Sequence, residues 1–295
     1  MAKLVRAYSS FLDEELGEVT PVLDHGYIIP IDYMGNETSI IKAAGVSYGS
    51  GTKKVSSAKA LLRYLMRHRH SSPFEQAAIA FEIKLPIFVA RQWLRHRMAH
   101  VNEYSMRYSL MINSYYMPDF RTQSKTNKQG SESLCSDELN EEFKRKTKEL
   151  LGKAFSLYDY LVSEDNNVTR ELARIVLPLN IYTKMVWSSD IHNLIHFCSL
   201  RSKPNAQEEI RVYSDVILHK YIKGWMPNVY EAFMDFRFNA ITLSGPVMEC
   251  MQKALLNPIA FYTTFGQELE KLYHEGRITK REVDEALDAF KGDKE

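Results

Sequence analysis

The chain has few cysteines, and they are widely separated. Cys135, Cys198 and Cys250 are the three cysteines among 295 residues, and none belongs to a C-x-x-C pair. An odd number of distant cysteines predicts reduced thiols, as in the cytoplasm, and argues against a disulfide framework. None has an evident activating neighbour, so a cysteine nucleophile is disfavoured, although Cys198 lies within the polar segment 190–201.

Long hydrophobic runs and an excess of charge are also missing. No stretch of about eighteen apolar residues occurs, so no transmembrane helix is expected. The first six residues lack the apolar core of a signal peptide, and we therefore expect a cytoplasmic protein. The net charge is only +1, so the protein has no overall positive electrostatic potential that would attract a polyanion. Neither a membrane nor a nucleic acid is an expected partner.

The remaining composition is that of a globular chain, with 45% apolar and 25% charged residues.

Residues 24–34 predict a strand that ends at the Gly35-Asn36 turn, and Ser56 or Ser57 can cap a following helix. Residues 121–136 indicate a flexible surface insertion, and a long helix is predicted from 137 to 163. We expect a catalytic domain over residues 1–240 and a helical extension over 241–295, with Gly276 between two helices and a capping box at 279–282.

Polar and charged side chains gather between residues 95 and 107. This segment reads Arg95-His96-Arg97-Met98-Ala99-His100-Val101-Asn102-Glu103-Tyr104-Ser105-Met106-Arg107. The apolar stripe of an amphipathic helix is broken here, and arginine forks suit phosphate or carboxylate. The segment therefore predicts a binding site for a charged, planar ligand. A solvated charged face or a structural salt-bridge cluster is the alternative.

The residues before this segment predict a rigid support for it. Residues 79–85 alternate apolar and polar side chains, which indicates a half-buried strand. Pro86 suits the first position of a buried helix over residues 87–94. On that helix Gln92, Arg95 and His96 would share one face. If the chain is extended further on, Glu103, Ser105 and Arg107 would point the same way.

The segment 95–107 resembles the signature R-H-R-x-x-S-x-N-E-x-S-x-R of the flavin-dependent thymidylate synthases. Every fixed position matches except one, where His100 replaces serine. The likeness extends to residues 70–75, 86–93, 173–180 and 187–201, and covers roughly residues 20–235. It implies an α+β fold, with a mixed sheet core flanked by long helices as in thymidylate synthase-complementing proteins. It also implies a homotetramer whose active sites combine several subunits.

The resemblance implies a methyltransferase that makes dTMP from dUMP. The one-carbon donor would be 5,10-methylenetetrahydrofolate, with hydride supplied through FAD from NADPH. Arg201 matches the family arginine that stabilises negative charge on the uracil ring, and is the expected catalytic residue. The folate and NADPH contacts are not legible, although His70 is a candidate for the folate side.

Further residues match the nucleotide and flavin contacts of the family. Ser105 is expected to bind, since nothing in the sequence supplies the base that an activated serine needs. The expected dUMP-binding residues are Gln92, Arg95, Glu103, Tyr104, Ser105, Met106, Arg107, Arg174 and Arg201. The expected FAD-binding residues are Ser72, Arg95, His96, Arg97, Glu103, Asp190, Ile191, His192 and His196.

The chain departs from the family at two places. Asp190, His192 and His196 stand where many members have asparagine and arginine; the two histidines have the i, i+4 spacing of metal ligands. No H-E-x-x-H signature is present, so we expect flavin contact and no metal. His100 replaces the first serine of the signature, and we expect that position to be structural.

Two other functions stay open. The departures allow a catalytically silent paralogue that binds flavin and nucleotide without turnover. The arginine cluster also allows an RNA-binding protein, which would show a steep salt dependence and basic strips interleaved with aromatic residues. The near-zero net charge argues against the second alternative.

Overall fold

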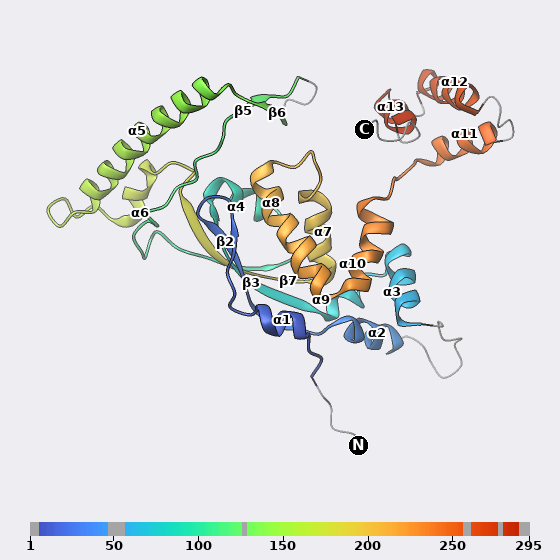
Figure 1. The fold of residues 1–295 in the computed structure, drawn as a ribbon, viewed down its shortest axis with the longest axis horizontal. Coiled ribbons are helices and arrows are strands. Elements are labelled where there is room, and N and C mark those ends of the chain that lie inside the picture. The colour runs from blue at the N-terminus through green and yellow to red at the C-terminus, as the bar shows by residue number, and fades with distance from the viewer. Residues whose placement is uncertain (1–5, 47–56, 126–128, 256–260, 277–279, 289–295) are drawn as a thin grey trace. The chain divides into compact units, whose positions relative to one another are not determined.

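The computed structural model describes residues 6–46, 57–125, 129–255, 261–276 and 280–288 (Figure 1). The chain divides into two compact units, residues 1–236 and 237–295. This boundary lies close to the expected one at residue 240. That the first unit is the catalytic domain and the second an extension stays a prediction.

A five-stranded sheet forms the centre of the first unit, in the order β1-β2-β3-β7-β4. All neighbouring strands pair antiparallel, so the α+β class is confirmed but the expected mixed sheet is wrong. Strands β3 and β4 run in the same direction, but β7 lies between them and no parallel pair forms. The strands are β1 (Thr20–Val22), β2 (Gly26–Met34), β3 (Ala78–Pro86), β4 (His100–Glu103) and β7 (Tyr182–Asp190).

Helices connect and cover these strands in the first unit. A 3₁₀ turn over Phe74–Gln76 precedes β3, another over Arg174–Val176 follows α6, and π-helical turns occupy Ile217–Ile222 and Met234–Phe238. The α-helices are α1 (Ser10–Glu15), α2 (Glu37–Val46), α3 (Ala58–Arg67), α4 (Ile87–Trp93), α5 (Asp137–Val162), α6 (Arg170–Ala173), α7 (Ile191–Arg201), α8 (Glu208–Val216), α9 (Lys223–Trp225) and α10 (Pro227–Phe233).

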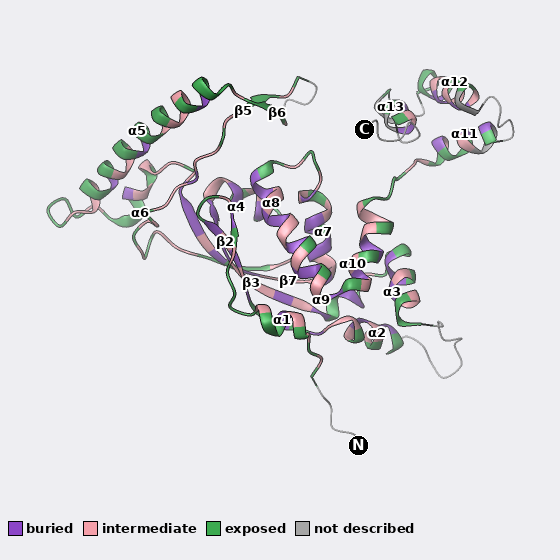
Figure 2. Ribbon diagram, viewed as in Figure 1, coloured by how far each residue is buried: buried purple, intermediate pink, exposed green. Residues whose placement is uncertain are grey.

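Strand β3 follows the predicted alternation, with every second residue from Ile79 to Leu85 buried (Figure 2). These side chains face an aromatic core supplied by α4, β7 and α7. The rings of Trp93 and Phe197 lie 4.5 Å apart, and those of Trp187 and Phe197 lie 5.4 Å apart. Such close pairs add to the free energy of area burial, and they hold α4 and α7 firmly on the sheet.

Two local predictions are confirmed by the backbone. Ser57 caps α3, and its hydroxyl accepts a 3.2 Å hydrogen bond from the backbone N–H of Ala60. Ser56 lies outside the described residues. Strand β2 ends at Met34, and the next residue is Gly35, whose φ of +79° glycine adopts without a steric penalty.

Three predictions need correction. Residues 121–136 were expected to form a flexible surface insertion without regular structure of its own, but β5 (Arg121–Gln123) pairs with β6 (Ser131–Leu134) in a hairpin whose residues are mostly exposed. Helix α5 exists as predicted, but only Leu151 and Tyr158 are buried of the core stripe that its sequence predicts, and Leu150 is exposed; the predicted stripe is Phe143, Leu150, Leu151, Phe155, Tyr158 and Leu161. The sequence predicts a strand over residues 179–187, but β7 begins and ends three residues later, so Asp190 closes the strand.

The second unit has its own small core, which includes Cys250, Phe265 and Leu269. Its described residues form three helices where two were expected: α11 (Gly245–Leu255), α12 (Phe261–His274) and α13 (Lys280–Asp288). Gly276, with φ of +70°, follows α12. The predicted capping residue Thr279 lies outside the described residues. Across both units, no helix among the described residues is long and apolar enough to cross a membrane.

Candidate functional site

Helix α4 leads the basic residues 95–97 into a turn. Pro86 is the N-cap of α4, one place before its predicted position, and the helix ends at Trp93. The backbone N–H of Arg95 bonds to the carbonyl of Gln92 (3.3 Å), and that of His96 to the carbonyl of Trp93 (3.0 Å). Three-residue bonds of this kind tighten a helix end. The predicted helical face shared by Gln92, Arg95 and His96 is therefore wrong.

A cavity of about 470 Å³ lies where this turn meets β7 and α7. Five of the predicted site residues share it, namely Arg95, His96, Arg97, His196 and Arg201. Its other lining residues are Met98, Ala99, Trp187, Ser189, Asn193 and Leu200. Three guanidinium groups and an apolar wall therefore face one volume.

His96 and Arg201 are joined directly inside this cavity. Nε of Arg201 donates a 2.9 Å hydrogen bond to Nε2 of His96. Burial, together with the neighbouring Arg201 and His196, lowers the pKa of His96 to about 4. Burial also lowers the pKa of Arg201. A neutral imidazole thus accepts from a charged guanidinium.

The start of α7 explains the role of Asp190. Its carboxylate caps the helix, accepting from the backbone N–H of Asn193 at 2.9 Å and from Nδ2 of the same residue at 2.7 Å. These bonds engage both oxygens of the carboxylate, which is the third group that the sequence offers as a metal ligand beside His192 and His196. Among the described residues, no group of three His, Cys, Asp or Glu side chains is placed to hold a metal ion.

The predicted nucleotide loop is extended only as far as Glu103. Its carboxylate accepts from the hydroxyl of Thr183 at 3.0 Å. The chain then turns, because the backbone N–H groups of Tyr108 and Ser109 both bond to the carbonyl of Ser105 at 3.1 Å. The extended chain on which a shared face of Glu103, Ser105 and Arg107 depended is therefore absent after Glu103. The main-chain hydrogen bonds of the turn determine the conformation here, although the alternation of polar and apolar residues is typical of a strand.

This turn meets α6 at Glu171. Arg107 forms an ion pair with the carboxylate of Glu171 at 3.0 Å, and Nε of Arg174 donates to the backbone carbonyl of Glu171 at 3.3 Å. Arg170 donates to the carbonyl of Tyr108 at 2.5 Å. Two of the predicted nucleotide arginines thus contact the same residue, Arg107 through the carboxylate of Glu171 and Arg174 through its backbone carbonyl. Both partners of the ion pair are about half exposed.

Five predicted flavin contacts lie outside the lining of the cavity. They are Glu103 and Asp190, whose carboxylates are described above, and Ser72, Ile191 and His192. Ser72 is exposed, His192 is half-buried, and the side chain of Ile191 is wholly buried in the core. Within the part of the chain that the structure describes, none of the five is a lining residue. Their contact with a flavin stays a prediction.

The sequence did not point to several residues that complete the site. Trp187 lines the cavity, and its indole Nε1 is buried with no hydrogen-bond partner among the described residues. Gln207 receives a hydrogen bond from Nε2 of Gln92. The pattern of β7 signalled a buried aromatic residue at position 187 but not its cavity, and no local pattern signals Gln207.

Cys198 plays no part in this site. Its side chain is fully buried, its thiol contacts the backbone carbonyl of Ser214 at 3.9 Å, and burial raises its pKa to about 12. Thiol chemistry needs the thiolate, which such a pKa suppresses. The argument against a cysteine nucleophile therefore gains a structural reason.

Comparison with known proteins gives consistent matches. Residues 31–228 match the family model described as "Thymidylate synthase complementing protein". The chain is 46% identical to the "Flavin-dependent thymidylate synthase" of Gluconobacter oxydans, covering 79% of this chain and 78% of the relative. It is 43% identical to the protein of the same name from Rickettsia bellii, covering 95% of this chain and 96% of the relative.

A solved structure is similar as well. It is the UMP/dUMP methylase PolB from Streptomyces cacaoi bound with 5-Br UMP, which is 30% identical with a TM-score of 0.66. The match covers 74% of this chain and 98% of that one. The arrangement of helices on the sheet is therefore shared with a nucleotide-binding relative.

Proposed function

The chain belongs to the thymidylate synthase complementing protein family, and from that premise we propose that it is a flavin-dependent thymidylate synthase, making dTMP from dUMP. One observation carries the proposal: the basic residues 95–97 of the family signature meet Arg201 in a single cavity. Two segments about a hundred residues apart thereby build one site. The likeness to relatives of this name along 95% of the chain supports the same reaction.

The residues of the cavity fit a flavin. Arg95 and Arg97 can hold the anionic part of FAD, while Trp187 and Leu200 offer an apolar wall to a flat ring. The indole N–H of Trp187 is buried behind this wall and has no hydrogen-bond partner among the described residues. When bound, the flavin supplies the redox chemistry that the side chains lack.

Arg201 is the proposed catalytic residue. Methylation at C5 requires the uracil ring to carry negative charge, and a fixed guanidinium stabilises such charge in a partly buried site. The hydrogen bond to His96 occupies Nε of Arg201, so the two terminal nitrogens are left for the ligand. His96 therefore holds the guanidinium in one orientation before the substrate arrives.

The nucleotide is proposed to lie along the turn that follows β4. Arg107 and Arg174 are already close together around Glu171, a suitable pair for a phosphate. Glu103, Tyr104, Ser105 and Met106 complete this part of the site, with Ser105 binding and not attacking. Gln92 and Arg95 are proposed as further nucleotide contacts.

The co-substrates and the assembly belong to the same proposal. We propose 5,10-methylenetetrahydrofolate as the one-carbon donor, NADPH as the reductant of FAD, and the cytoplasm as the location. The chain is proposed to act as a homotetramer. Strand β4 supports this because it is the edge of the sheet and all four of its residues are exposed. Such an edge is normally covered or paired.

Release of tritium from dUMP labelled at C5 tests the function. The assay contains 5,10-methylenetetrahydrofolate and NADPH, with and without added FAD. Release that depends on FAD is the expected result. Folded protein loaded with FAD that binds dUMP but releases no tritium would identify a silent paralogue. Tight RNA binding with a steep salt dependence, and no nucleotide binding, would identify the remaining alternative.

A further inference from the structure

A chain of hydrogen bonds leads from Gln92 into the body of the first unit. Nε2 of Gln92 donates to Oε1 of Gln207, and Nε2 of Gln207 donates to Oε2 of Glu209 at 2.8 Å. The other oxygen of Glu209 accepts from Arg121 at 2.5 Å and from the hydroxyl of Tyr116 at 3.2 Å. Four separate segments, namely α4, the start of α8, β5 and the stretch before β5, are joined in this way.

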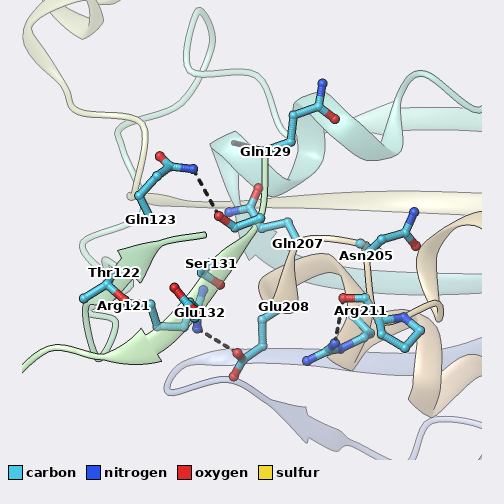
Figure 3. A pocket seen from close by; sticks show the side chains of 13 residues that line it. Arg121, Thr122, Gln123, Gln129, Ser131, Glu132, Asn205, Gln207, Glu208 and Arg211 are labelled. Atoms are coloured by element: carbon cyan, nitrogen blue, oxygen red, sulfur yellow. Dashed lines mark hydrogen bonds and ion pairs between the residues drawn. The ribbon is translucent and has the colours of Figure 1, made fainter. Parts of the chain in front are cut away.

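The chain of bonds runs along a polar pocket of about 570 Å³, whose far wall is the β5–β6 hairpin. Figure 3 shows Gln207 beside Glu208 and Arg121, with Gln123 on the hairpin opposite. Arg121 bridges the two walls, since it also pairs with Glu208 at 2.9 Å. Arg121, at the end of this series of hydrogen bonds, is therefore held by the carboxylates of Glu208 and Glu209 on α8.

Glu209 determines which group donates and which accepts in each hydrogen bond from Gln92 to Glu209. Its residue is only 3% exposed. Burial alone would raise the pKa of this carboxyl, but the hydrogen bond from Arg121, together with bonds from its own backbone and from Gln207, holds the pKa below its ordinary value. An ionised carboxylate only accepts hydrogen bonds. Gln207 must therefore present its NH₂ group to Glu209 and its carbonyl oxygen to Gln92.

The orientation of the Gln92 amide follows from that of Gln207. Because Gln207 offers only an acceptor, Gln92 must donate with Nε2, and a flipped amide would place two carbonyl oxygens face to face. An amide flip is usually free for an exposed glutamine. Here one N–H of Gln92 is committed, and its second N–H and its carbonyl oxygen are left in fixed directions.

We infer that Gln207 and Glu209 are positioning residues that hold the amide of Gln92 for the nucleotide. The inference rests on the proposed function, in which Gln92 contacts dUMP. A group that is oriented before binding loses less conformational entropy on binding, so the effect falls on nucleotide affinity. The chemical step at the uracil ring, where Arg201 acts, is left unchanged.

A double-mutant cycle tests the inference on the FAD-loaded full chain. The variants are Gln92→Leu, Gln207→Leu and both together, with Gln123→Leu as the matched control. Gln123 lines the same pocket, but its amide donates to the carbonyl of Gly130 within the hairpin at 3.2 Å. The dissociation constant of dUMP is measured by calorimetry, kcat and KM by tritium release, and folding by thermal melting.

We expect Gln207→Leu to weaken dUMP binding about three- to tenfold, the size of one net hydrogen bond, with kcat unchanged. In the Gln92→Leu background the same substitution should have no further effect, and Gln123→Leu should bind dUMP normally. An unchanged dissociation constant in Gln207→Leu, or an equal loss in both backgrounds, overturns the inference. So does normal dUMP binding by Gln92→Leu, while FAD-dependent tritium release by the unaltered chain still upholds the proposed function.

Discussion

The guanidinium of Arg201 donates through Nε to Nε2 of His96, 105 positions earlier in the chain, at 2.9 Å. This bond determines the tautomer of His96. An accepting Nε2 carries no proton, so the proton of the neutral ring must lie on Nδ1. The ring is held from the side by Phe197, whose centroid lies 4.9 Å away in an edge-to-face arrangement. The geometry therefore ties the signature segment to α7 through one defined nitrogen.

Replacing Arg201 tests its proposed catalytic role. We expect Arg201→Ala to lower kcat by about 10²–10³-fold, the cost of removing one donor that stabilises a developing anion. Arg201→Lys should recover part of the loss, because its single ammonium restores charge but not the fork. The measurement is tritium release under saturating dUMP. A variant that folds, binds FAD and dUMP and keeps its full kcat would show that another group stabilises the ring.

The depressed pKa of His96 predicts how stability depends on pH. In the folded protein this pKa is about 4, below the ordinary value of 6.5, so the unfolded chain binds more protons in that interval. The free energy of unfolding should therefore fall as the pH drops from about 6.5 towards 4. Urea unfolding across this range measures the slope, and His96→Gln should flatten it. An equal slope in the variant would assign the dependence to other groups.

The sequence predicted the strand 79–85 and the helix after it, because alternation and a buried apolar run are local signals. It also predicted the gathering of Arg95, His96, Arg97 and His196 with Arg201, through the family resemblance. The end of α4 at Trp93 was missed. The choice between a tightened turn and a continued helix depends on main-chain hydrogen bonds, which the pattern of side chains does not reveal.

Long-range polar contacts were beyond the reach of sequence patterns. The ion pair of Arg107 with Glu171 and the bond of Gln92 to Gln207 join residues 64 and 115 positions apart. No period or spacing encodes such pairs, which form only once the sheet and its helices are in place. The hairpin at 121–134 was missed for a related reason, because its strands are short and polar and have no hydrophobic alternation.

Glu171 is predicted to compete with the nucleotide for Arg107. The pair is about half exposed on both sides, so it adds at most about 1 kcal/mol to the free energy of unfolding. We expect Glu171→Gln to leave thermal stability nearly unchanged and to tighten dUMP binding, because a phosphate no longer displaces a carboxylate. Calorimetric titration of dUMP at two salt concentrations measures this. Weaker binding would mean instead that Glu171 holds Arg107 in the orientation that the ligand needs.

His100, which replaces the serine of the family signature, is predicted to be tolerant of change. It lies on the edge strand β4 opposite Ser188, and its side chain is exposed. It is not among the residues that line the cavity of Arg95 and Arg201. Exposed substitutions away from special features usually change stability by within about 0.5 kcal/mol. We expect His100→Ser to shift activity only modestly, as measured by tritium release beside the unaltered chain. If the unaltered chain is inactive and His100→Ser restores turnover, the serine position has a chemical role and the chain as it stands is the silent paralogue.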